Sequence, residues 1–241
     1  MTEVKFQLYI VRHGETMENR KGFLQGHKNT QLTDVGRKQA ESVGSYLDTT
    51  AFHEAYSSDL TRAFETCQLI LEKSKSESKD LQIEKNTALR ERHFGDWEGM
   101  HRSVFAEMAG RRSFEHFIPP GGESLEDVGE RAINWFDGLC NSVFDLNKKE
   151  TDPPTRNVLL VSHGGWICAF LRKLVSERNC GLPDDIPLKK SSLGICPNAG
   201  LSIMGVTISH TKRVKTKVHT LHKTTYTAED ILEKINAEAA E

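Results

Sequence analysis

The stretch "LYIVRHGETMEN", from Leu8 to Asn19, joins an apolar run directly to a charged and flexible segment. The apolar side chains between Phe6 and Val11 are typical of a buried strand. An arginine, a histidine and a glycine follow at once, so the backbone leaves the core at this point. We therefore expect Arg12, His13 and Gly14 to be presented at the end of a strand.

A second segment repeats this pattern. "NVLLVSHGGWICAFL", residues 157–171, is an apolar strand that ends in His163 and Gly164 before an apolar helix. Ligands of α/β sheets bind outside the carboxyl ends of the strands, so we expect the two histidines to meet in one pocket. Glycine after each histidine lets backbone N–H groups approach an anion, and the guanidinium of Arg12 matches phosphate oxygens two at a time. For either histidine alone, an ordinary buried or helix-starting residue is an equally good interpretation.

The remaining sequence predicts alternating helices and strands. Thr33 is expected to cap one helix, and Ser124 and Asp127 have the spacing of a capping box at the start of another. Further helices are expected at 60–71, after Gly164 and from about Thr227, further strands at 54–58, 81–84, 201–208 and 214–221, and a loop from Gly14 to Thr30. This alternation argues for a three-layer α/β/α sandwich with a mainly parallel central sheet. Because no internal repeat or low-complexity segment marks a boundary, residues 1–241 are expected to form a single domain.

The composition disfavours several classes of protein. The chain has 241 residues with 32 basic and 34 acidic side chains, so no net field draws it to nucleic acid or to an anionic membrane. No apolar run approaches the ~20 residues needed to span a bilayer. The segment "MTEVKFQL" lacks the features of a secretory signal, which favours a cytoplasmic location. The five cysteines form no C-x-x-C pair, so we expect reduced thiols that serve as small buried side chains.

Two kinds of chemistry are open to the paired histidines. With a carboxylate such as Glu91 they could form a facial metal triad, but Arg12 would place a permanent cation beside a divalent ion. Alternatively, a neutral imidazole attacks phosphorus and forms a phosphohistidine, which splits one difficult transfer into two steps. That route needs positive groups around the phosphoryl oxygens, which Arg12 and His163 can supply, and a proton donor for the leaving oxygen. We favour the covalent route, without a metal or cofactor.

The motifs at these positions resemble those of the histidine phosphatase superfamily, which has the phosphoglycerate mutase-like fold. "VRHGET" with Asn19 is similar to the superfamily signature, and "SHGG" is similar to the segment of its second histidine. "SSDLTRAFET", "LRERHFGDWEG" and "PPGGES" resemble later blocks of the family and occur in the family's order. Because the resemblance spans nearly the whole chain, it implies both the fold and a metal-independent phosphoryl transfer.

The resemblance also implies roles for individual residues. His13 matches the phosphorylated nucleophile, and Glu91 matches the proton donor and acceptor. Without the resemblance, Glu91 would be interpreted as a surface ion-pair partner of Arg90 or Arg92. The residues implied to hold the phosphoryl group are Arg12, Arg62 and His163. The predicted substrate-binding residues are Asn19, Gln25, Gly26, Arg92 and Gly164.

Within the superfamily, "FIPPGGESLEDV", "WFDGLC", "NCGLP" and "CPNAGLSI" are most similar to fructose-2,6-bisphosphatase-like regulators of glycolysis. This implies a small phosphorylated sugar or glycerate as substrate, with fructose 2,6-bisphosphate favoured. The alternatives are a bisphosphoglycerate phosphatase or a phosphoglycerate mutase and, in another class, a non-catalytic phosphate-binding or partner-docking module. A bisphosphorylated substrate needs a second cationic patch, for which the candidates are Arg20, Lys21, His27, Arg92, Arg111 and Arg112.

Overall fold

Six strands form one mixed sheet in the computed structural model, which describes residues 3–74, 77–109, 117–148, 150, 153–187 and 193–226. Their order in the sheet is β3-β2-β4-β1-β5-β6. The strands are β1 (Val4–Arg12), β2 (Glu54–Ser58), β3 (Ile83–Asn86), β4 (Arg156–Ser162), β5 (Leu201–Ile208) and β6 (Val214–Lys223). The α-helices are α1 (Met17–Lys21), α2 (Asp34–Tyr46), α3 (Thr61–Lys73), α4 (Arg102–Ala109), α5 (Leu125–Asn147) and α6 (Gly164–Glu177). Short 3₁₀ helices cover Glu77–Asp80, Thr87–Leu89 and Gly95–Trp97.

Four neighbouring strands are parallel and the other edge of the sheet is antiparallel. β1 pairs with β4, β4 with β2, and β2 with β3, all in parallel. Parallel neighbours need crossover connections, and α2, α3 and α5 lie in the segments that supply them. β5 runs antiparallel to β1, and β6 runs antiparallel to β5. The expected mainly parallel sheet is confirmed, with an antiparallel edge whose direction the apolar pattern does not specify.

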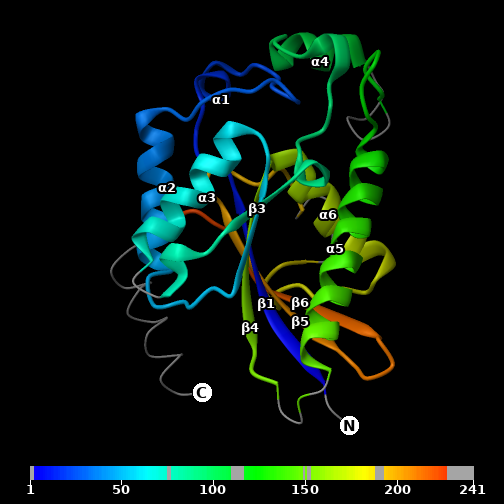
Figure 1. Ribbon diagram of the computed structural model, residues 1–241. Helices are drawn as coiled ribbons and strands as arrows, with labels where there is room; N and C mark the ends of the chain where they lie inside the picture. Colours follow the sequence, from blue (N-terminus) through cyan, green and yellow to red (C-terminus); the bar gives the residue numbers. More distant parts are fainter. Residues whose placement is uncertain are drawn as a thin grey trace.

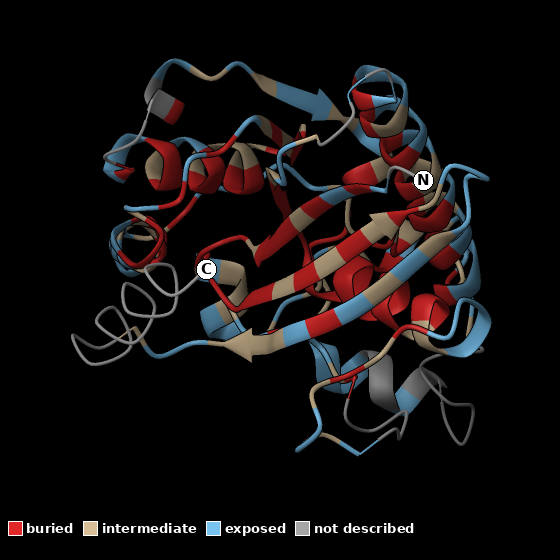
Figure 2. Cartoon of the chain, turned by 90° about the horizontal axis from the view of Figure 1, so that it is seen from below, coloured by how far each residue is buried: buried red, intermediate tan, exposed pale blue. Residues whose placement is uncertain are grey.

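Helices cover both faces of the sheet. α2 and α3 lie on one side, and α5 and α6 lie on the other (Figure 1). Side chains alternate along β1, so Leu8 and Ile10 join the apolar cluster under α5 and α6, whereas Tyr9 and Val11 join the cluster under α2 and α3. Burial of each large apolar side chain contributes about 1.5–3 kcal/mol. Figure 2 shows buried residues along the strands and on the inward helix faces, as expected for a three-layer sandwich.

Two of the helices, α2 and α5, begin at the predicted caps. The Thr33 hydroxyl accepts the Gly36 N–H at 3.1 Å at the start of α2. Ser124 and Asp127 form the predicted capping box at the start of α5. Each cap satisfies an N–H group that the helix itself leaves open, which is worth about 1 kcal/mol. In the part of the chain that the structure describes, no helix is long and apolar enough to cross a membrane.

The segment expected to be a loop contains a short helix. α1 follows a capping box formed by Thr16 and Asn19 and ends at Gly22, whose φ of 76° is in the left-handed region. Its five residues are too few to show a helical period in the sequence. The prediction of loop for the whole of Gly14 to Thr30 was therefore wrong, and the helix holds Asn19 near the strand end.

Two other expectations differ from the structure or lie beyond it. β3 begins at Ile83, two residues later than the predicted strand, because boundaries of short strands depend on pairing rather than on local pattern. The expected helix from about Thr227 lies outside the described residues, as do Arg111 and Arg112.

All five cysteines are free and buried, in agreement with the expectation of reduced thiols. Burial raises the pKa of the Cys140 and Cys196 thiols to about 12. These thiols remain protonated at neutral pH, which argues for packing rather than reactivity.

Candidate active site

The two histidines lie at the same edge of the sheet. β1 and β4 are parallel neighbours in register up to Arg12 and Ser162, so each strand delivers its next residue, His13 or His163, to the carboxyl edge. The centroids of the two imidazole rings are 5.1 Å apart. α1 and α4 lie over this edge (Figure 1). The expected meeting of the two histidines is confirmed.

The hydrogen bonds of His13 determine which ring nitrogen is free. Its Nδ1 lies 2.7 Å from the carbonyl oxygen of Gly14, which can only accept, so Nδ1 carries the ring proton. Nε2 therefore has a lone pair, and Arg62 Nε donates to it at 3.3 Å. Burial, followed by the charges of Arg62 and Arg12, lowers the pKa of His13 well below its ordinary value. At neutral pH His13 is a neutral imidazole with an unprotonated Nε2 atom.

His163 is the N-cap residue of α6 and is fully buried. Its Nε2 lies 2.8 Å from the Ser58 hydroxyl, whereas Nδ1 has no hydrogen-bond partner among the described residues. Burial, followed by the charge of Arg62, lowers the pKa of His163 well below its ordinary value. If the Ser58 hydroxyl donates to Nε2, an Nδ1–H group is left to donate to a ligand oxygen.

Two guanidinium groups flank His13. Arg62, in the first turn of α3, is fully buried and donates to the carbonyl oxygens of Lys28 at 2.7 Å and Gly26 at 2.9 Å. Burial lowers the pKa of Arg62 to about 10, so it is a cation at neutral pH. Arg12 donates to the Cys196 carbonyl at 2.6 Å, and its Nε has no partner within the described part of the chain. Both groups can therefore place positive charge beside Nε2.

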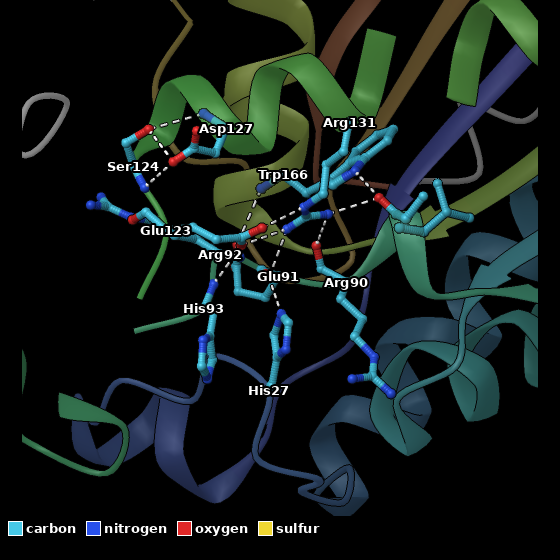
Figure 3. Close-up of polar contacts among 12 residues, drawn as sticks. His27, Arg90, Glu91, Arg92, His93, Glu123, Ser124, Asp127, Arg131 and Trp166 are labelled. Carbon is cyan, nitrogen blue, oxygen red and sulfur yellow. Dashed lines mark hydrogen bonds and ion pairs between the residues drawn. The ribbon is translucent and has the colours of Figure 1, made fainter. Parts of the chain in front are cut away.

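Glu91 reaches the same edge from the loop before the third 3₁₀ helix. Its Oε2 accepts the Gly165 N–H at 3.0 Å. Its Oε1 accepts the Trp166 N–H at 3.1 Å and the Arg92 N–H at 2.8 Å. Figure 3 shows Glu91 between Trp166, in the first turn of α6, and the side chain of His27. The helix dipole and the first-turn N–H groups of α6 thus orient the carboxylate.

A cavity of about 330 Å³ opens beside these groups. It is lined by Arg12, His13, Asn19, Gly22, Phe23, Leu24, Gln25, Gly26, Arg62, Glu91, Phe94, Arg102, Gly165, Ile195 and Asn198. The volume suits a small metabolite. The wall includes every predicted site residue except Arg92, His163 and Gly164, and His163 lies next to the His13 ring.

Comparison with known proteins identifies the family. The sequence profile of the histidine phosphatase superfamily (branch 1) matches residues 8–217. The chain belongs to this superfamily. Fructose-2,6-bisphosphatase TIGAR of Xenopus tropicalis is 34% identical over 244 residues, covering 85% of this chain and 88% of that protein. The broad-specificity phosphatase YOR283W of Saccharomyces cerevisiae is 35% identical over 178 residues, covering 72% of each.

A solved structure supports the fold assignment. Phosphoglycerate mutase from Bacillus anthracis superposes with a TM-score of 0.73, covering 95% of this chain and 97% of that chain at 23% identity. At this identity the likeness concerns the fold alone, and it confirms the phosphoglycerate mutase-like architecture. Because the chain belongs to the histidine phosphatase superfamily and both of these relatives are phosphatases, it is a phosphatase.

Two predicted amide side chains lie in the cavity wall of this superfamily member. The Asn19 carbonyl oxygen accepts from the Thr16 N–H at 3.2 Å and from the Asn198 amide at 3.0 Å. The Gln25 carbonyl oxygen accepts from the hydroxyls of Thr16 at 3.1 Å and Thr30 at 2.5 Å. Because protein donors hold both carbonyl oxygens, the NH₂ groups of the two amides are the donors that remain for an anion.

Two glycines at the start of α6 are required by close approach to the site. A Cβ atom at Gly164 would lie 2.8 Å from Ile195 Cγ2 and 3.2 Å from Arg12 Cζ. A Cβ atom at Gly165 would lie 2.4 Å from Glu91 Oε1. Sequence reasoning predicted Gly164 as a binding residue, but the cavity wall contains Gly165 instead.

The two arginines that flank Glu91 in the sequence bind elsewhere. Arg90 pairs with both carboxylate oxygens of Asp59, at 2.7 and 2.5 Å. Arg92 is fully buried, and its guanidinium donates to the carbonyl oxygens of Glu123, at 2.8 Å, and Phe117. The ion-pair interpretation of Glu91 is therefore wrong, and Arg92 lies outside the cavity wall rather than facing a substrate.

A third arginine in the described part of the cavity wall, besides Arg12 and Arg62, was missed. Arg102, the first residue of α4, lines the cavity, whereas Arg20 and Lys21 do not. The ring of His27 bonds a backbone carbonyl at 2.9 Å instead of forming part of a cationic patch. No sequence signal distinguishes Arg102 from other exposed arginines, because its direction depends on how α4 lies over the sheet edge.

Asn198 was also missed as a site residue, although its segment "CPNAGLSI" carries part of the resemblance. Its side-chain amide donates to the carbonyl oxygens of His13 at 3.2 Å and Gly14 at 3.3 Å. It also donates to Asn19 Oδ1. The pairing of β5 with β1 brings Asn198 to the strand end, so a Pro-Asn turn before a strand was the available signal.

Proposed function

We propose that the chain hydrolyses a phosphomonoester of a small metabolite through a phosphohistidine at His13, with fructose 2,6-bisphosphate as the favoured substrate. The observation that carries this proposal is the hydrogen bond between His13 Nδ1 and the Gly14 carbonyl, at 2.7 Å. It leaves Nε2 unprotonated at the cavity, next to the Arg62 guanidinium. A neutral imidazole nitrogen held in this way is an activated nucleophile.

In the first step Nε2 attacks phosphorus, and the bond between phosphorus and the leaving oxygen breaks. The leaving oxygen takes a proton from the Glu91 carboxyl group, which lines the same cavity. Arg12 and Arg62 balance the charge that develops on the equatorial phosphoryl oxygens. His163 Nδ1 is a further donor to these oxygens. The products are the dephosphorylated alcohol and phosphohistidine.

In the second step a water molecule attacks the phosphohistidine. The Glu91 carboxylate takes a proton from this water, and the bond between phosphorus and Nε2 breaks. Inorganic phosphate leaves, and His13 returns to its neutral form with Nδ1 still bonded to Gly14. A phosphatase must admit water at this stage, whereas a mutase must exclude it until the product is rephosphorylated.

The 34% identity to fructose-2,6-bisphosphatase TIGAR of Xenopus tropicalis supports a bisphosphorylated sugar as substrate. The cavity wall offers Arg102 as a cation for a second phosphate, in addition to the two guanidinium groups beside His13. Phe23, Phe94 and Ile195 offer apolar contacts to a sugar ring. Such an enzyme would regulate glycolysis in the cytoplasm, a location that fluorescence microscopy of a tagged chain tests.

Phosphate release from a substrate panel tests the proposal. The panel contains fructose 2,6-bisphosphate, fructose 1,6-bisphosphate, 2,3-bisphosphoglycerate and phosphoglycerates, all in chelator, with phosphoglycerate isomerisation followed in parallel. The His13→Ala variant gives the background. Fast release from fructose 2,6-bisphosphate alone is expected. Preference for a glycerate, or isomerisation without release, would move the activity to a bisphosphoglycerate phosphatase or a mutase and refute the proposed substrate.

A further inference from the structure

Arg131, on α5, uses every N–H group of its guanidinium. Its NH1 group donates to the carbonyl oxygens of Ala88 and Arg90, both at 2.7 Å. Its NH2 group donates to the Glu91 carbonyl oxygen at 2.9 Å and to Glu123 Oε2 at 3.0 Å, and Nε donates to Glu123 Oε1 at 2.9 Å. Figure 3 shows this guanidinium between Glu123 and the backbone that carries Glu91. One side chain thus ties the segment of the proposed proton donor to α5.

Glu123 holds the guanidinium in this orientation. Its two carboxylate oxygens accept in parallel from Arg131, and Oε2 also accepts the His93 N–H at 2.8 Å. Burial by itself raises the pKa of Glu123, but the hydrogen bonds from Arg131 and His93 outweigh burial and lower it. Glu123 is therefore ionised at neutral pH, and the bidentate pair restrains Arg131 in two directions.

The hydrogen bonds of Arg131 and Glu123 hold the main chain on both sides of Glu91, whereas the Glu91 carboxylate makes no hydrogen bond with either side chain. Arg131 donates to the carbonyl oxygens of Ala88, Arg90 and Glu91, and Glu123 accepts the N–H of His93. The Glu91 carboxylate instead contacts the N–H groups of α6 and lines the cavity. Arg131 does not line the cavity, so its effect on a substrate must pass through Glu91.

We propose that Arg131, oriented by Glu123, is a positioning residue for proton transfer by Glu91. The inference rests on the role of Glu91 proposed above. A planar fork is needed because the acceptors lie on two sides of the guanidinium, and a lysine ammonium cannot reach all five oxygens. Proton transfer depends on the position of the carboxyl group relative to the leaving oxygen, so loosening the backbone of Glu91 weakens this step before it affects phosphate binding.

The test compares two leaving groups in the full-length enzyme. The first substrate is the sugar phosphate of the panel from which phosphate is released fastest. Its leaving alcohol has a high pKa and needs a proton. 4-Nitrophenyl phosphate has a leaving group that departs without one. The variants are Glu91→Gln, Arg131→Lys and the double variant. Arg156→Lys is the matched control, because Arg156 pairs with Glu54 at 3.2 Å at the opposite end of the sheet with similar exposure.

Glu91→Gln is expected to lose about 10²- to 10⁴-fold in kcat/KM on the sugar phosphate and far less on the aryl phosphate. The quantity compared is kcat/KM because it ends at the formation of phosphohistidine, whereas kcat also includes the hydrolysis step that both substrates share. Arg131→Lys is expected to lose at least about tenfold more in kcat/KM on the sugar phosphate than on the aryl phosphate. The double variant should be no slower than Glu91→Gln, because both changes act on one step. Arg156→Lys should change the two rates by equal factors.

Equal losses for both substrates in Arg131→Lys, or no loss, would overturn the inference and leave the role of Glu91 intact. Failure of Glu91→Gln to discriminate between the substrates would overturn the proposed role of Glu91 itself, and with it the inference. If Arg131→Lys does not fold, Glu123→Gln provides the second test, because it keeps the side-chain shape but removes the charge that orients Arg131. The same selective loss on the sugar phosphate is expected, and an unselective loss would refute the inference.

Discussion

Replacing Gly165 by alanine tests Glu91 without altering its carboxyl group. A Cβ atom at this position would lie 2.4 Å from Glu91 Oε1 and 3.2 Å from its Cδ atom. Ordinary contacts begin near 3.4 Å, so the carboxylate must withdraw by about 1 Å. Gly165 lies in α6, where alanine is itself a favourable residue.

The size of the effect follows from this displacement. Withdrawal lengthens the hydrogen bonds from the N–H groups of Gly165, now 3.0 Å, and Trp166, now 3.1 Å. A misplacement of 1 Å reduces a rate by about 10²-fold, equivalent to about 2.7 kcal/mol in the barrier. A lost hydrogen bond to a charged group lowers the free energy of unfolding by about 1.5–3 kcal/mol. Replacing glycine by alanine within a helix raises it by about 0.5–1 kcal/mol. We expect a net loss of about 1–2 kcal/mol in the free energy of unfolding.

Steady-state kinetics and urea unfolding measure the two quantities. The kcat/KM for the sugar phosphate should fall about 10²-fold, and the kcat/KM for 4-nitrophenyl phosphate should fall much less, because that leaving group needs no proton. Gly138→Ala on α5 is the matched control, since a Cβ atom there meets nothing within 4 Å. This control should gain about 0.5–1 kcal/mol of stability with unchanged kcat. A folded Gly165→Ala enzyme with the kcat/KM of the wild type on the sugar phosphate would refute the reasoning.

Three further outcomes are expected. His13→Ala should abolish phosphate release but retain the fold, because the Gly14 carbonyl keeps its hydrogen bond from Asn198; measurable turnover would refute the phosphohistidine mechanism. Burial foremost lowers the pKa of both His13 and His163, so the unfolded chain binds more protons below pH ~6.5. The contribution of these histidines to the free energy of unfolding should therefore be fully present above that pH. Below it, the free energy of unfolding should fall by about 1.4 kcal/mol per pH unit for each histidine, until the pKa of the folded state is passed. Urea unfolding at pH 7.5 and 5.5 should show a smaller fall in His163→Asn, and an identical fall would contradict this account. Arg102→Gln should raise the KM of a bisphosphorylated substrate about tenfold or more, with little change for a monophosphate; equal changes would exclude Arg102 as the second phosphate ligand.

Features of the fold with local signals were predicted from the sequence. The run from Phe6 to Val11 indicated a buried strand, and the structure buries alternate residues of it against opposite helical layers. Thr33 and Ser124 marked helix starts because their hydroxyls accept N–H groups only a few residues away. α1 was missed since it is too short for a period and depends on the capping box of Thr16.

The candidate site was predicted in part, and the division has a physical reason. His13 and His163 follow parallel strands, and the carboxyl ends of such strands meet at one edge whatever the loops do. Long side chains obey no such rule. Arg92 was expected to face a substrate, but it turns inward to backbone carbonyls, while Arg102 reaches the cavity.

The sequence by itself therefore determined the position of His13, its neighbouring cation and the sheet edge, because strand ends and glycine turns are local properties of the chain. Only the tertiary structure decided the proton state of His13 Nε2, the cation at the cavity rim and the support of Glu91. These depend on carbonyl oxygens and N–H groups from distant segments, such as the bonds that Arg131 makes to Ala88 and Glu91. A buried guanidinium must find acceptors to offset its lost hydration, and which acceptors lie within reach is set by packing rather than by spacing in the sequence.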